Sequence, residues 1–147
     1  LFGRWSTRGF AEFAGTSCQF HESSERFNCA YNHFIYKTGY RYRARSIGHP
    51  ADNDSRVISV GFVAADVNDT QWRGLIRVGD LNRGGSPDSR NSLTPTPQDI
   101  ASIDISHSRV FSFGVIDVGA GYETVDDIAS GISFSDTRAY VQWRSSY

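Results

Sequence analysis

The residues best suited to chemistry lie in the stretch from Gly39 to Gly61, which reads GYRYRARSIGHPADNDSRVISVG. Three arginines alternate there with two tyrosines and an alanine, namely Arg41, Arg43 and Arg45 against Tyr40, Tyr42 and Ala44. Successive side chains of a strand point to opposite faces, so the three guanidinium groups are expected on one face. A guanidinium is a planar donor fork that suits a carboxylate. The stretch therefore predicts a hairpin with one basic side and one apolar side.

Four more arginines alternate with apolar residues in later segments of the chain: Arg73, Arg77, Arg138 and Arg144. If the strands form a barrel, all seven arginines face its lumen. Two interpretations follow. The arginines form a surface for an anionic glycan, or they form internal salt bridges with Glu12, Asp104, Asp117 and Asp136. Internal pairing is the favoured interpretation for most of them.

No catalytic or metal-binding motif stands out. Asp52-Asn53-Asp54 resembles the start of a calcium loop, but Arg56-Val57 breaks the EF-hand pattern that requires a glycine and a later glutamate. The four histidines show no zinc-ligand spacing with the cysteines. Two carboxylate pairs fit a glycosidase by residue type only, Asp52 with Asp54 and Asp126 with Asp127. The sequence therefore predicts no enzyme, no metal and no cofactor.

Cys18 and Cys29 enclose ten polar-rich residues, QFHESSERFN. Two cysteines that close such a loop indicate a disulfide and an oxidising compartment. The alternative is a pair of reduced structural thiols.

Apolar and polar residues alternate with a period of two through most of the chain, which predicts an all-β antiparallel meander of about eight strands. The expected strands are Trp5–Ser17, Phe27–Tyr36, the two arms of the hairpin around residues 49–55, Gln71–Asn82, Asp99–Val110, Phe113–Glu123 and Phe134–Tyr147. Long loops are expected at residues 18–29, 49–55, 83–98 and 125–133. Short turns are expected at residues 37–39, 68–70 and 111–112.

Strands of about ten residues, long loops alternating with short turns, and aromatic residues near strand ends are typical of an outer-membrane β-barrel. Nine apolar residues are then expected on the lipid-facing side: Ile58, Val60, Phe62, Ile76, Val78, Ile116, Val118, Val141 and Trp143. A soluble β-sandwich is the alternative, and it would pack these residues against a second sheet.

The composition narrows the classes of protein further. The chain has 147 residues and a net charge of −1, which argues against a nucleic-acid-binding surface. It contains no run of eighteen apolar residues that would make a transmembrane helix. It also contains no methionine, even at position 1, so we expect a single portion, residues 1–147, of a longer protein.

Four segments resemble the bacterial capsule assembly Wzi family, in the order found in that family. They are Tyr31 to Gly61, VGDLNRGG from Val78 to Gly85, LTPTPQDI from Leu93 to Ile100, and the closing RAYVQW from Arg138 to Trp143. The most specific block is Tyr40 to Asp54. The resemblance covers the C-terminal part of the family and implies a fragment of a Gram-negative outer-membrane β-barrel, monomeric in the full-length protein.

The same resemblance implies a lectin-like, non-catalytic protein that assists the attachment of capsular polysaccharide, with polysaccharide and outer-membrane lipid as partners. The candidate polysaccharide-binding residues are Arg41, Arg43, Arg45, Asp52, Asp54, Arg73 and Arg77. A porin for anionic sugars, a secreted carbohydrate-binding sandwich and a surface glycosidase remain as alternatives. As a fragment, the chain is expected to form a curved open sheet with Trp5–Ser17 and Phe134–Tyr147 as free edges.

Overall fold

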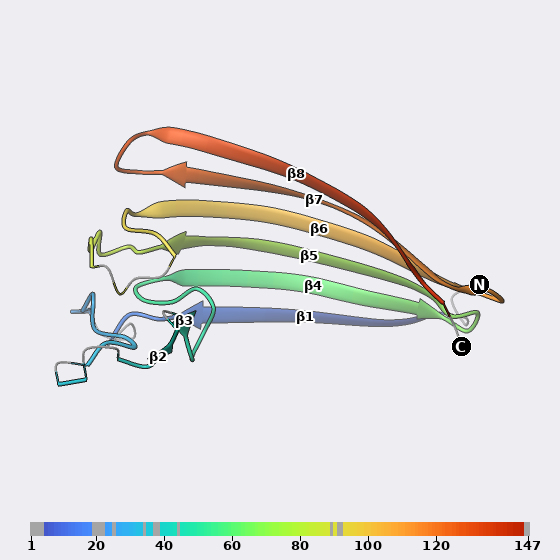
Figure 1. Ribbon diagram of the computed structural model, residues 1–147, viewed down its shortest axis with the longest axis horizontal. Coiled ribbons are helices and arrows are strands. Elements are labelled where there is room, and N and C mark those ends of the chain that lie inside the picture. The colour runs from blue at the N-terminus through green and yellow to red at the C-terminus, as the bar shows by residue number, and fades with distance from the viewer. Residues whose placement is uncertain are drawn as a thin grey trace.

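The computed structural model describes residues 5–18, 23–24, 26–33, 35–36, 39–43, 45–88, 90 and 93–145. Six long strands form one antiparallel sheet in the order β1-β4-β5-β6-β7-β8 (Figure 1). Their bounds are Trp5–Gly15 for β1, Arg56–Asp66 for β4, Thr70–Leu81 for β5, Gln98–Phe111 for β6, Gly114–Asp127 for β7 and Ile132–Arg144 for β8. Two very short strands, β2 (Arg41–Tyr42) and β3 (Arg45–Ser46), pair with each other only.

The all-β meander is confirmed, but two of the expected long strands are wrong. Phe27–Tyr36 contains no strand among its described residues, and the first arm of the expected hairpin is reduced to β2, a tight turn and β3. Arg43 has a positive φ of 50° within that turn, which a continuing strand does not allow. Residues 16–55 therefore form one long connection, and β1 pairs directly with β4. Ala44 lies outside the described residues.

Strand lengths also differ from expectation at the C-terminal end of the sheet. Residues 125–127 and 132–133, expected in a loop, continue the ladder between β7 and β8, with Asp127 opposite Ile132. That connection is therefore a turn of residues 128–131. At the opposite end of the sheet, residues 67–69 and 112–113 form the short turns. The terminal Tyr147 lies outside the described residues.

The register places all nine apolar residues expected to face lipid on one side of the sheet. Ile58 is opposite Val78, Val60 is opposite Ile76, and Ile116 and Val118 are opposite Trp143 and Val141. Between these strands, Ile103 lies opposite both Ile76 and Tyr122. This apolar face is exposed, with 49% of the surface of Ile76 and 77% of that of Val141 accessible.

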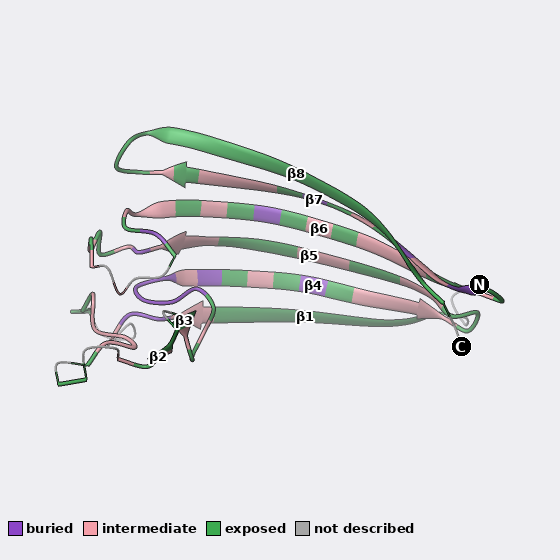
Figure 2. Cartoon of the chain, in the orientation of Figure 1, coloured by how far each residue is buried: buried purple, intermediate pink, exposed green. Residues whose placement is uncertain are grey.

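The described part of the chain has almost no hydrophobic core. Ala51 and Val57 are its only buried hydrophobic residues, and β8 is exposed along its length (Figure 2). No second sheet packs on either face of the six strands among the described residues, so the sandwich alternative is wrong. Among the described residues, no helix is long and apolar enough to cross a membrane.

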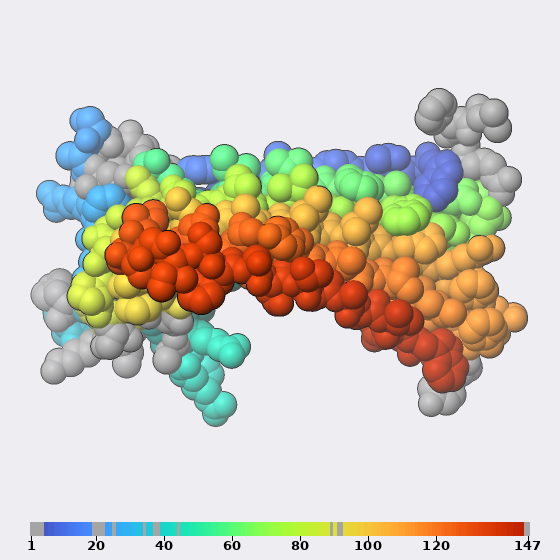
Figure 3. Space-filling model, turned by 90° about the horizontal axis from the view of Figure 1, so that it is seen from above, coloured from blue at the N-terminus to red at the C-terminus, as the bar shows by residue number. Residues whose placement is uncertain are grey.

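The sheet is open, as expected. β1 and β8 each pair with one neighbour only, and no ladder joins them. Seen from above, the strands from β8 to β1 lie one behind another as one continuous surface (Figure 3). In lipid, an unpaired strand edge would leave backbone groups without hydrogen bonds, at a cost of several kcal/mol each. The two edges therefore require further strands in the full-length protein.

A matched pair of substitutions on β5 tests which face contacts lipid. Ile76→Arg places a charge on the apolar face at the middle of the strand, whereas Leu75→Arg places it on the other face. In the full-length protein, we expect Ile76→Arg to reduce the free energy of unfolding from bilayers by about 2–4 kcal/mol, and Leu75→Arg to have little effect. Urea titrations of vesicle-inserted protein measure both. Equal effects would show that the sheet does not face lipid on one side.

Candidate functional site

The loops that follow the strands at one end of the sheet fold into a compact unit, which we call the loop platform. It consists of the described residues of 16–55 and 82–97. Figure 1 shows these segments gathered beyond the same ends of the long strands. The opposite end of the sheet carries only short turns. The longest loops therefore lie at one end of the sheet.

The centre of the loop platform is the buried segment Asp52-Asn53-Asp54-Ser55, in which each residue is at most 1% exposed. Ser55 N–H donates to Thr16 Oγ1 (2.8 Å), and Thr16 N–H donates to Ser55 O (2.9 Å). Arg83 N–H donates to Asp54 O (2.9 Å). These bonds tie the end of β1 and the segment after β5 to the residues that precede β4, so the platform is fixed to the sheet by backbone contacts.

Arg41 and Asp52 form a buried ion pair. Arg41 Nη2 lies 2.8 Å from Asp52 Oδ1, and the two side chains are 4% and 1% exposed. Arg41 Nη1 also donates to Asn32 Oδ1 (2.6 Å) and to Tyr31 O (3.1 Å). A buried charge of this kind needs its partner, because removing one member leaves the other unpaired in a poorly solvated place. Both predicted site residues are therefore internal, and their part in a glycan surface stays a prediction.

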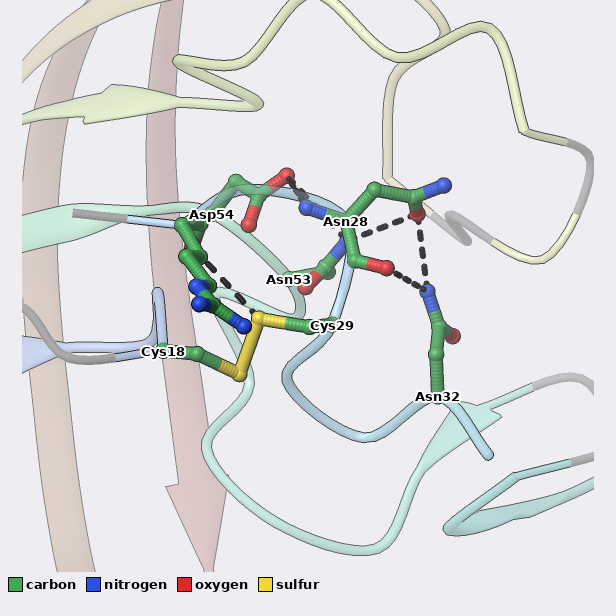
Figure 4. Close-up of a disulfide and its surroundings, with 7 residues drawn as sticks. Cys18, Asn28, Cys29, Asn32, Asn53 and Asp54 are labelled. Atoms are coloured by element: carbon green, nitrogen blue, oxygen red, sulfur yellow. Dashed lines mark hydrogen bonds between the residues drawn. A yellow bond between two sulfur atoms is a disulfide. The ribbon is translucent and has the colours of Figure 1, made fainter. Parts of the chain in front are cut away.

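Asn28 joins the two loops of the platform (Figure 4). Its backbone N–H donates to Asp54 Oδ2 (2.6 Å), and its side-chain Nδ2 donates to Asp88 Oδ2 (3.2 Å). Its Oδ1 accepts hydrogen bonds from Asn32 and Asn53. Asp54 is fully buried in these contacts, so it too is internal.

A disulfide joins Cys18 and Cys29 next to this cluster, with the two Cα atoms 6.0 Å apart (Figure 4). Cys29 immediately follows Asn28, and Cys18 follows the buried Thr16 and Ser17 at the end of β1. The covalent link therefore holds Asn28 near the end of the sheet, where Asp54 lies.

The second loop of the platform is organised by Asn82 and Asp88. Asn82 is 1% exposed, and its side chain bonds Ser86 at both the carbonyl and the amide, as well as Thr94 O. Arg90 forms a two-point contact with the Asp88 carboxylate. Hydrogen bonds from Arg90 hold the pKa of the Asp88 carboxyl well below its usual range. Asp88 therefore stays ionised at neutral pH, and it can accept from Asn28.

The exposed side of the loop platform combines aromatic rings with cations. Tyr36, Tyr40 and Tyr42 are each between 67% and 70% exposed. Arg43 and Arg45 are exposed beside them, and the Arg43 guanidinium lies 5.4 Å from the centre of the Tyr42 ring. Exposed tyrosine rings offer a large contact surface at a low cost in side-chain entropy, and the arginines add attraction for anions. Two of the predicted site residues, Arg43 and Arg45, are therefore brought together here.

Arg73 and Arg77 lie far from the platform loops, on the polar face of β5 opposite the apolar side. The salt-bridge interpretation applies to two other arginines on this face, since Arg138 pairs with Asp104 (2.7 Å) and Arg144 with Asp117 (2.5 Å). Within the described residues, neither Arg73 nor Arg77 forms a salt bridge, and Arg73 donates instead to Gln71 Oε1.

The sequence interpretation missed Asn28 and Asn82, which organise the platform. Both have a positive φ, 54° and 47°, a conformation that asparagine tolerates better than most residues. An asparagine outside any alternating pattern, next to a cysteine or at a strand end, is the only signal that could have found them. The described residues contain no group of three or more His, Cys, Asp or Glu side chains that could hold a metal ion.

Removing the charge of Arg41 tests whether the platform depends on its buried pair. We expect Arg41→Met in the full-length protein to lower the local stability of the platform by about 3–5 kcal/mol, because Asp52 is left unpaired. Hydrogen exchange followed by mass spectrometry should show fast exchange in residues 45–55 with no change in β5 to β7. The exposed Arg43→Met is the matched control and should change nothing. Recovery in Arg41→Met/Asp52→Asn would identify the unpaired carboxylate as the cause.

The disulfide gives a second test of the platform. We expect material exported through an oxidising compartment to show intact Cys18–Cys29 by mass spectrometry without reductant. Replacing both cysteines by serine should destabilise the platform by roughly 3 kcal/mol and expose residues 23–33 to protease. Two freely alkylated thiols in the exported protein would contradict this.

Comparison with known proteins agrees with this geometry. A solved structure described as Wzi, an outer membrane protein involved in group 1 capsule assembly in Escherichia coli and a carbohydrate-binding β-barrel, matches with a TM-score of 0.69 at 18% sequence identity. The match covers 92% of this chain and 29% of that one, so the six long strands have the fold of part of that barrel. No curated protein sequence matches the chain. The family model of the capsule assembly protein Wzi matches residues 1–127, and the chain therefore belongs to the Wzi capsule assembly family.

Proposed function

We propose that this chain is part of the wall of an outer-membrane β-barrel and that its loop platform binds acidic capsular polysaccharide at the cell surface. The observation that carries the proposal is the set of exposed side chains Tyr36, Tyr40, Tyr42, Arg43 and Arg45, which the platform backbone presents next to the buried Arg41–Asp52 pair. Long loops face outward in barrels of this class. Membership of the capsule assembly family supports polysaccharide as the ligand.

The chemistry of this surface suits a sugar chain. The C–H face of a pyranose packs on a tyrosine ring, and its hydroxyl groups bond the phenol oxygen and guanidinium nitrogens. A uronic acid adds a carboxylate, which forms charge-assisted hydrogen bonds with arginine. A tyrosine side chain has only two torsion angles, so ordering its ring on binding costs little conformational entropy.

The positions of the candidate acids support a non-catalytic role. Asp52 and Asp54 are fully buried and cannot flank a glycosidic bond. Asp126 and Asp127 are neighbours within β7, so their side chains point to opposite faces of the sheet. Neither pair has the two carboxylates on either side of a cleft that glycoside hydrolysis requires.

Binding of purified capsular polysaccharide by the full-length protein tests the proposal. We expect Tyr40→Ala/Tyr42→Ala to weaken binding about tenfold, and Arg45→Gln to weaken it mainly at low salt, where exposed charges are least screened. Phe113→Ala is the matched control, because it truncates an exposed aromatic ring in a short turn at the other end of the sheet.

Two results would overturn the proposal. Unchanged affinity in the tyrosine variants would remove the loop platform as the site. Shortening of the polysaccharide by the purified protein, measured by size-exclusion chromatography, would show catalysis.

One observation favours a second candidate, a porin for anionic sugars. Arg8, Arg73 and Arg77 form no salt bridge within the described part of the polar face, and unpaired cations in a lumen attract anions. Single-channel conductance of the full-length protein separates the two functions. A porin conducts ions, whereas an attachment protein whose loops cover the lumen conducts little.

A further inference from the structure

The polar face of the sheet contains a hollow of about 270 Å³ near the middle of the strands. Its lining includes two aromatic rings, two arginines, one carboxylate and one leucine: Phe10, Tyr140, Arg73, Arg138, Asp104 and Leu75. These residues come from β1, β5, β6 and β8, so the hollow runs across the strands. It is distinct from the loop platform, which lies beyond the strand ends.

Glycines on this face let the lining side chains lie flat. A Cβ at Gly61 would clash with the Phe10 ring, and a Cβ at Gly119 would clash with the Tyr140 ring. The Arg138–Asp104 ion pair crosses Gly121 in the same way. The ring of Phe10 therefore lies over β4, and the ring of Tyr140 lies over β7. A glycine within a strand often marks a place where a ligand or another group approaches closely.

The lining side chains keep about half of their surface exposed on the polar face. Phe10 and Tyr140 are 48% and 50% exposed, and the Arg138 side chain is 47% exposed within its salt bridge. Arg138 donates from both Nε and Nη2 to Asp104. The paired guanidinium and carboxylate therefore form one polar unit in the hollow, beside the two rings. Two aromatic rings with a polar unit beside them match the alternating C–H faces and hydroxyl groups of linked pyranoses.

The net charge beside the hollow is positive, although Asp117, which is paired with Arg144, also interacts electrostatically with Arg73. Arg8 and Arg73 lie in the same cross-strand row as Tyr140, with Val63 between the two arginines. Neither arginine forms a salt bridge in the described residues. The acids Glu12, Glu123 and Asp136 share the row of Arg77, four residues nearer the loops. That is about 13 Å along a strand, which exceeds the Debye length of about 8 Å at physiological salt.

We propose that this hollow is a second glycan subsite, which binds a short segment of the polysaccharide through stacking on Phe10 and Tyr140 and holds the carboxylate of an acidic sugar at Arg73. The inference rests on the proposed function, because it assigns a further place on the same ligand. The loop platform would hold the chain at the outer surface, and the hollow would hold a segment that enters the lumen.

Calorimetry on the full-length protein in detergent tests the subsite, with oligogalacturonate as the acidic probe and a malto-oligosaccharide of equal length as the neutral probe. We expect Arg73→Gln to weaken binding of oligogalacturonate about tenfold and leave the neutral probe unchanged. Tyr140→Ala should weaken both. Val141→Ala, on the opposite face of the same strand, is the matched control and should affect neither.

The result also separates the subsite from the loop platform. If Tyr40→Ala/Tyr42→Ala weakens binding and the hollow variants do not, the proposed function stands and the subsite is wrong. If neither set weakens binding, both are wrong. Where Tyr140→Ala fails to fold, Arg73→Gln carries the test. If the thiol of a Tyr140→Cys variant does not react with a charged maleimide in the folded protein, other parts of the chain fill the hollow, which also overturns the subsite.

Discussion

The whole structure depends on one constraint, which is that a single layer of sheet has two faces and no interior. Every residue of the six strands points to one side or the other, and the register keeps the two sets apart from β1 to β8. Ile76, Ile103 and Tyr122 lie side by side on one face, and Arg77, Ser102 and Glu123 on the other. Because the sheet buries almost nothing against itself, its stability must come from what contacts each face. An apolar solvent on one side and a wet lumen on the other satisfy both sets.

The part of the chain that does have an interior is the loop platform, and that interior is polar. Asp52, Asn53, Asp54 and Ser55 are buried with hydrogen bonds and the Arg41–Asp52 ion pair, and Ala51 is the only buried hydrophobic residue among the described residues of the platform. Such a cluster gains little net stability per contact, but each buried polar group is costly to leave unpaired. The backbone of the platform is therefore held in a defined arrangement.

How much of the fold and of the candidate site could be predicted depends on what determines the position of each residue. Along β5, the alternation of Trp72, Ile76 and Val78 with Arg73 and Arg77 is set by the two solvents, so the sequence alone predicts the strand and its faces. The alternation of tyrosine and arginine at residues 40–45 looked the same but has another cause. Arg41 is buried because it forms an ion pair with Asp52. The alternation of neighbouring residues cannot reveal a partner eleven positions away. Of the predicted site residues, Arg43 and Arg45 are therefore exposed, whereas Arg41, Asp52 and Asp54 have buried side chains.

The arginines also bear on the size of the barrel. Arg41 is buried with Asp52, Arg138 is half exposed with Asp104, and Arg8, Arg73 and Arg77 have no salt bridge among the described residues. A guanidinium without a carboxylate partner must stay hydrated or bind an anion. The free-energy cost of burying an unpaired charge is larger than the stability that a single sheet layer can provide. A narrow barrel fills its lumen with side chains and has no space for that water. If the sheet is part of a barrel, the charges on its polar face require a wide, wet lumen. This requirement agrees with the match to a longer barrel chain, of which this chain covers 29%.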